Sequence, residues 1–141
     1  MSTFPKSPKD DVDGLLYFGR MLDKIQLRAR GELAEEYYAN MGRATAADGA
    51  MCNFLRLDYH KVRERGLAGG TDEEILEWCY ENGRRPNKGD LVVWNGFISK
   101  LGWNDFATPT LTRWKKHHGI ADRSDIATMS DLFDFEGGRR S

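Results

Sequence analysis

The stretch GRMLDKIQLRARG at residues 19–31 places charged residues on a helix that already has an apolar face. At about 100° per residue, one face collects the apolar side chains Leu15, Phe18, Met21, Leu22, Ile25 and Ala29. The opposite stripe carries Arg20 and Asp23, with Lys24 at its flank. A guanidinium, a carboxylate and an amine in one place could bind an anion and transfer a proton. These three residues are the first candidate site.

Two leucines on the charged stripe indicate that another element covers it. Leu16 and Leu27 follow the helical spacing of Arg20 and Asp23. On a solvated face, an Arg20–Asp23 ion pair would contribute only roughly a few tenths of a kcal/mol and the leucines would be exposed. On a covered face, the charges are partly desolvated, and the cluster then either fixes helix packing or lines a ligand pocket. The sequence leaves both alternatives open.

The charge balance of this helix indicates which ligand a pocket would accept. Between residues 15 and 31, Asp23 stands against four basic residues, Arg20, Lys24, Arg28 and Arg30. A pocket lined by such residues would favour an anion such as a carboxylate or a phosphate.

Tyrosine and amide side chains elsewhere could complete such a pocket. Tyr37, with Tyr38 and Asn40 nearby, could donate to a developing oxyanion while Lys24 or Asp23 transfers the proton. The alternative is that the tyrosines anchor the chain and the asparagine forms a turn. Asn95, at the edge of an apolar stripe, either bridges helices or faces the pocket.

Helical periodicity and capping signals run through most of the chain. Thr71 and Glu74 form a capping box that opens a helix, and Asn87 and Asp58 are further caps. Residues 32–48 are ambiguous between a short helix and a loop. The predicted helices span about residues 13–30, 47–57, 58–65, 71–82, 88–103, 108–118 and 124–133. The fold class is therefore all-α, a compact single-domain bundle of about six or seven helices. We expect an extended N-terminal arm at 1–12, one helical domain at 13–135 and a flexible tail at 136–141.

Composition argues against several classes of protein. The chain has 141 residues and a net charge of −1, without the basic footprint of a nucleic-acid binder. No apolar run reaches the roughly 18 residues of a membrane span. Its two cysteines are predicted to be reduced, buried thiols of a cytoplasmic protein.

Metal and cofactor signatures are also missing from the sequence. The three histidines, His60, His117 and His118, do not follow a metal-ligand spacing. The segment GLAGG is a turn before a helix and not a glycine-rich phosphate loop. We therefore expect no metal and no cofactor, and the sequence does not indicate the oligomeric state.

Several motifs together resemble a known family. PKSP, DGLLYFGRMLDKIQLRARG, EYYAN, FLRLD, TDEEILEW and VVWNGF are similar to a family of small bacterial proteins grouped as the domain of unknown function DUF5069, over most of residues 5–98. The resemblance marks Arg20, Asp23, Lys24, Glu36, Tyr37, Asn40, Asp48, Trp78, Trp94 and Asn95. The chain departs from the family pattern at Gln26, where a basic residue is usual and Arg28 could substitute. It also has MGRATAAD where the family has a turn with cysteine and proline.

The combined prediction is a bacterial, cytoplasmic helical protein that binds a small anionic metabolite around Arg20, Asp23 and Lys24, with acid/base chemistry as a further step. The predicted catalytic residues are Asp23, Lys24 and Tyr37. The predicted ligand-binding residues are Arg20, Arg28, Glu36, Asn40 and Asn95. The alternative is a non-catalytic interaction or structural module in which the charge cluster only fixes helix packing.

Overall fold

A computed structural model describes residues 4–141 of the chain. Over these residues, seven α-helices, one 3-10 helix (η1) and a two-stranded hairpin form the regular structure. The all-α class and the predicted number of helices are thereby confirmed. The elements in chain order are β1 Asp11–Val12, β2 Leu15–Leu16, α1 Phe18–Ala29, η1 Glu35–Asn40, α2 Ala47–Leu55, α3 Tyr59–Leu67, α4 Asp72–Asn82, α5 Lys88–Lys100, α6 Thr108–His117 and α7 Met129–Glu136.

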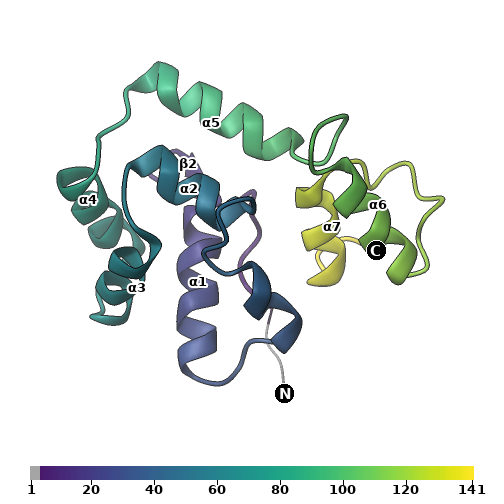
Figure 1. The fold of residues 1–141 in the computed structure, drawn as a ribbon, viewed down its shortest axis with the longest axis horizontal. Helices are drawn as coiled ribbons and strands as arrows, with labels where there is room; N and C mark the ends of the chain where they lie inside the picture. The colour runs from purple at the N-terminus through teal and green to yellow at the C-terminus, as the bar shows by residue number, and fades with distance from the viewer. Residues whose placement is uncertain (1–3) are drawn as a thin grey trace.

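Helix α1 lies at the centre, and the other helices are arranged in two groups around it (Figure 1). Helices α3 and α4 contact α1 and each other on one side. Helix α5 contacts β2 and then α7, and α6 packs on α7. The long α5 thus connects the first four helices to the α6–α7 pair, which lies on the other side of α1 and α2 (Figure 1).

The start of α1 differs from the prediction. The chain forms an antiparallel hairpin in which Val12 pairs with Leu15, and the helix begins only at Phe18. The turn residues Asp13 and Gly14 have φ angles of 47° and 85°. Asp-Gly favours the type I′ turn of two-residue hairpins, because both positions need positive φ. The prediction that Asp13 caps a helix was therefore wrong, since this residue closes a strand turn.

Most other helix starts follow their capping residues. Helix α4 begins and ends as predicted, and both hydrogen bonds of the Thr71–Glu74 capping box are present. Asp58 caps α3 and Asn87 caps α5, as expected. The last helix was placed too early, because its cap is Thr128 and not Ser124. Helix α5 ends at Lys100, three residues before the predicted end.

Both faces of α1 are buried. The predicted core face packs inside, with Phe18 and Met21 fully buried. On the opposite stripe, Arg20 and Leu27 are each only 2% exposed, which confirms that this stripe is covered. Ala29, assigned to the core face, is exposed because the helix ends there.

The N-terminal arm and the residues at the C-terminus help to cover the charged stripe of α1. Pro5, Ser7 and Pro8 of the arm are buried. Lys9 forms ion pairs with Asp131 and Asp134 of α7, at 3.2 and 3.3 Å. Beyond α7, Arg139 donates to the Pro5 carbonyl, and Arg140 contacts Asp131. The predicted domain boundaries and the flexibility of the tail stay predictions. Within residues 4–141, no helix combines the length and apolar character needed to cross a membrane.

Candidate functional site

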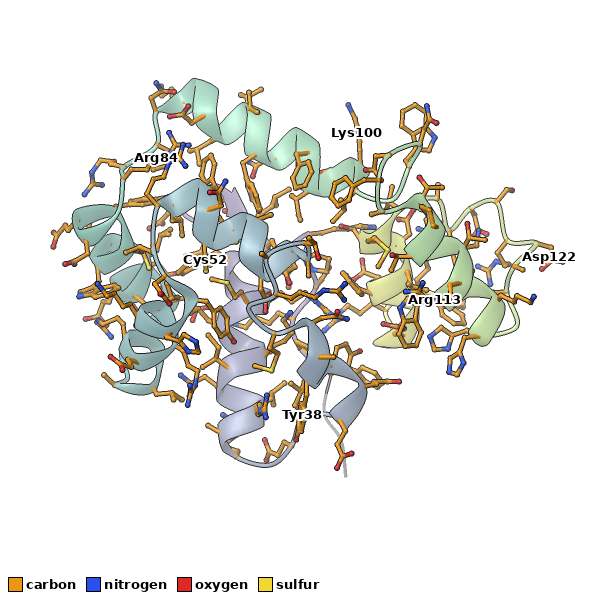
Figure 2. All side chains as sticks on the ribbon, viewed as in Figure 1. Tyr38, Cys52, Arg84, Lys100, Arg113 and Asp122 are labelled. Atoms are coloured by element: carbon orange, nitrogen blue, oxygen red, sulfur yellow. The ribbon has the colours of Figure 1, made fainter. Side chains whose placement is uncertain are left out.

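A cavity of about 770 Å³ lies where η1 and the start of α2 face α5, α6 and α7. Side chains from both groups of helices extend into the space between them (Figure 2). Arg20 and Lys24 of α1 line the cavity together with Tyr37 of η1 and Glu136 of α7. Its charged and amide lining also includes Glu36, Asn40, Arg43 and Arg113. We refer to it as the Arg20 cavity.

Arg20 is a buried cation without an acidic partner. Its guanidinium donates to the Lys6 carbonyl at 3.1 Å and lies over the Phe133 ring, 4.2 Å from the centroid. Its buried Nε has no hydrogen-bond partner, and no carboxylate of residues 4–141 forms an ion pair with it. A buried charge is costly unless a counter-charge or hydrogen bonds compensate for it. Arg20 therefore favours an anion in the cavity.

The Arg20–Asp23 ion pair, considered from the sequence for a solvated face, does not form. Both side chains turn to the arm instead, where Asp23 accepts a hydrogen bond from the Lys6 backbone N–H at 2.9 Å. Lys6 thus supplies its carbonyl to Arg20 and its amide to Asp23. Asp23 is half-buried and does not line the Arg20 cavity. Lys6 of the arm thus provides the hydrogen-bond partners of both residues, and helical spacing alone did not predict this contact.

Lys24 has an acidic partner from another helix. Its Nζ lies 2.7 Å from Asp48 Oδ1 of α2, and it donates to the Tyr17 hydroxyl at 3.0 Å. Tyr17 in turn donates to Asp48 Oδ1 at 2.6 Å, and the Gly42 amide donates to Asp48 Oδ2 at 3.1 Å. Burial lowers the pKa of Lys24, and the nearby Asp48 opposes that change. Burial also raises the pKa of Tyr17 well above its usual value.

Tyr37 contacts a group that sequence analysis missed. Its hydroxyl lies 3.5 Å from Glu136 Oε1, and Glu136 Oε2 lies 2.7 Å from His118 Nε2. Burial and the Glu136 carboxylate raise the pKa of Tyr37 to about 12. The Tyr37 hydroxyl is therefore protonated at neutral pH and able to donate. Glu136 and His118 lie about 100 and 80 residues beyond Tyr37, and no local motif connects them.

Two predicted ligand-binding residues lie outside the Arg20 cavity. Arg28 stacks on the Tyr38 ring, 4.0 Å from its centroid, and lines a different cavity. The Asn95 side chain accepts from the Leu16 amide at 3.1 Å and donates to the Gly14 carbonyl at 2.8 Å. Asn95 thus bridges α5 and the hairpin, which is the structural alternative stated for it.

The lining of the Arg20 cavity combines positive charge with aromatic rings. Its four cations, Arg20, Lys24, Arg43 and Arg113, outnumber its two carboxylates, Glu36 and Glu136. Its aromatic members are Tyr17, Tyr37, Phe97, Phe106, Trp114 and Phe133. Such a lining suits an anion with an apolar body. Among the described residues, no three His, Cys, Asp or Glu side chains are placed to hold a metal ion.

The family model of DUF5069, described as a domain of unknown function, matches residues 2–139 of the chain. The chain belongs to the DUF5069 family. This confirms the resemblance stated from the motifs and extends it to α6 and α7, which supply part of the Arg20 cavity. No curated protein in the comparison matches this DUF5069 chain. Asp48, marked by the family resemblance and by no other feature of the sequence, is the ion-pair partner of Lys24.

Proposed function

We propose that this DUF5069 protein binds a small anion, a carboxylate or a phosphate, in the Arg20 cavity. The observation that carries the proposal is Arg20 itself, a guanidinium that is 2% exposed, lines a cavity and has no acidic partner in residues 4–141. Lys24 differs because Asp48 already compensates its charge. An oxyanion bound in the cavity would supply the counter-charge that Arg20 lacks among the described residues.

The size and walls of the cavity support a ligand larger than a simple ion. Its volume of about 770 Å³ lies in the range of sites for organic ligands. The ring of Phe133 already stacks on Arg20, and Trp114 and Phe97 extend the apolar wall. We infer an amphipathic anion, with its charged group at Arg20 and its body between the aromatic rings.

A proton-transfer step at this site would use Lys24 and Tyr37. Lys24 lines the cavity one helical turn from Arg20, and its lowered pKa favours release of a proton. Tyr37 stays protonated and can donate to a developing oxyanion. Asp23 is not proposed for this role, because its carboxylate binds the arm outside the cavity.

A structural role for the charge cluster is the second candidate. The Lys24–Asp48–Tyr17 network is closed and buried, and it joins α1 to α2 and to the Gly42 segment. This observation favours a cluster that fixes helix packing. It does not account for Arg20, whose Nε has no partner.

The proposal is tested with 3-phenylpropionate and its neutral analogue 3-phenylpropanol, with binding measured by isothermal titration calorimetry. The two probes have the same phenylalkyl body, but the first carries a charged carboxylate and the second a neutral hydroxyl group. We expect the acid to bind at least tenfold more tightly than the alcohol, because only the acid compensates Arg20. Arg20→Gln should abolish this preference, and Arg20→Lys should keep part of it.

The control is Arg30→Gln, which removes an exposed arginine of the same helix region that lines neither cavity. It should leave the preference unchanged. Circular dichroism establishes that each variant is folded. Equal affinity for acid and alcohol in the unmodified protein, or an unchanged preference in folded Arg20→Gln, would refute the proposal and leave the structural role.

We also propose that the protein works in a reducing bacterial cytoplasm. Cys52 and Cys79 are both free and buried. Their packing in the core is typical of thiols that act as small apolar side chains.

A further inference from the structure

A second cavity lies on the other side of the segment that joins η1 to α2. It has a volume of about 790 Å³ and is bounded by the end of α1, by α2 and by α3. Ala44 lines this cavity and also the Arg20 cavity, so the segment around it forms a wall between the two. Arg28, which the sequence singled out for anion binding, lines the second cavity.

Two arginines in this lining have no acidic partner within residues 4–141. Arg28 contacts the Tyr38 ring and the sulfur of Met41, the latter at 3.9 Å. Arg63, from α3, forms no hydrogen bond or ion pair with the described residues. Asp58 is the acidic residue of the lining, and its carboxylate already caps α3 by accepting from the His60 amide. The balance of charge in this cavity is therefore positive.

Tyr59 adds a polar group without a partner. Its hydroxyl is buried and forms no hydrogen bond with the described part of the chain. Gly42 packs on its ring so closely that a Cβ there would lie 2.5 Å from a ring carbon. Gly42 also has a φ of 70°, which glycine adopts without strain. The ring is thus fixed in the wall of the cavity, and burial raises the pKa of its hydroxyl, which stays a donor.

Buried hydroxyl groups in folded proteins nearly always have a hydrogen-bond partner. Arginine pairs with oxyanions through two parallel N–H donors, and two such groups at one cavity favour a phosphate or a carboxylate. The same two signs, an unpartnered buried polar atom and an unpaired guanidinium, mark the Arg20 cavity. Here the unpartnered hydroxyl is that of Tyr59 on α3, and the guanidiniums belong to Arg63 on α3 and Arg28 on α1, which are exposed residues, unlike Arg20.

We propose that the second cavity is a separate oxyanion site, in which Arg28 and Arg63 bind the charged group and Tyr59 lies in the wall as a hydrogen-bond donor. Its ligand class is a phosphate or a carboxylate. The site is independent of the function proposed for the Arg20 cavity, because the two linings share Ala44 and none of their charged residues.

Titration with inorganic phosphate and, separately, with acetate tests the proposal, followed by two-dimensional NMR of backbone amides. Gly42 and Gly49 line the second cavity and not the Arg20 cavity, so their amides report on this site. We expect saturable shifts of both amides. Arg28→Gln and Arg63→Gln should each raise the dissociation constant at least tenfold. A response to phosphate alone identifies a phosphate site, and a response to both anions identifies a general oxyanion site.

The matched control is Lys61→Gln, which removes an exposed cation of α3 that lines neither cavity. It should leave the dissociation constant unchanged, and so should Arg20→Gln. The proposal is overturned if neither anion shifts Gly42 and Gly49, or if Arg63→Gln and Lys61→Gln bind equally. It is also overturned if Arg20→Gln abolishes the shifts, because the amides would then report on the other cavity. The NMR spectrum of each variant shows directly that it is folded.

Discussion

At the residue scale, Asp23 and Lys24 are adjacent in the sequence and lie in opposite environments. Asp23 is half-buried and accepts one hydrogen bond from the arm. Lys24 is 5% exposed and pairs with Asp48, which is 1% exposed. The cost of removing a charge depends on what remains of its partner. A buried carboxylate without its ammonium is costly, whereas an exposed amide loses little when its acceptor becomes neutral.

We therefore predict that Lys24→Met lowers the free energy of unfolding by about 3–5 kcal/mol, because it leaves Asp48 buried without a counter-charge. Asp23→Asn, which keeps an acceptor for the Lys6 amide, should lower it by less than about 1 kcal/mol. Urea unfolding measures both values.

The double variant Lys24→Met with Asp48→Asn is the control for this pair. It removes both charges and should be more stable than Lys24→Met alone. If the second change gives no recovery, the ion pair does not determine the stability of this region. If Asp23→Asn and Lys24→Met lower the free energy of unfolding equally, the prediction from their difference in burial is wrong.

Arg20 and Lys24 illustrate what the sequence predicts at this scale. The spacing of Arg20 and Asp23 with Leu16 and Leu27 predicted that the charged stripe is covered, and the burial of Arg20 confirms it. The partners of Arg20 and Lys24 were not predictable from helical spacing, because Asp48 comes from α2 and Lys6 from the arm. A local pattern gives the face of a helix, and the tertiary fold determines which groups meet there.

At the scale of elements, local hydrogen-bonding signals determined how well each boundary was predicted. The start of α4 was predicted correctly because Thr71 and Glu74 satisfy each other's backbone amides within one turn. The hairpin was missed although Asp13-Gly14 is a turn signal, because its strands have two residues each and show no alternation. Helix α7 was misplaced because Ser124 and Thr128 are both plausible caps, and only Thr128 accepts from the amide three residues on.

We predict that Thr71→Ala lowers the free energy of unfolding by about 1 kcal/mol, because the Glu74 amide loses its acceptor at the start of α4. Thr112→Ala is the matched control. Thr112 is exposed on α6 and its side chain makes no hydrogen bond with the described residues. Chemical denaturation of both variants checks the difference. If Thr112→Ala lowers the free energy of unfolding by as much as Thr71→Ala, the capping hydrogen bond makes no specific contribution to stability.

At the scale of the whole molecule, the Arg20 cavity is assembled from residues far apart in the sequence. Arg20 lies near the N-terminus, and Phe133 and Glu136 lie in the last helix. Lys9 of the arm pairs with Asp134 of α7, and Arg139 donates to the Pro5 carbonyl, so the two ends of the described chain lie together next to the α7 side of the cavity. Helical periodicity carries no information on such contacts, which explains why sequence analysis found only the α1 and η1 side of the cavity.

The core also determines how the molecule responds to alkaline pH. Burial raises the pKa of Cys52 and of Cys79 from 9.0 to about 12, so the folded protein keeps both thiols protonated where the unfolded chain ionises. Because the unfolded state then binds fewer protons, stability is complete below about pH 9 and falls as the pH rises toward the folded pKa. At about pH 10 the loss should be roughly 1.4 kcal/mol for each thiol. Urea unfolding across this range should show a shallower decline for Cys52→Ala with Cys79→Ala, although that variant starts less stable through lost packing. Parallel declines in the two proteins would mean that the thiols ionise equally well in the folded core.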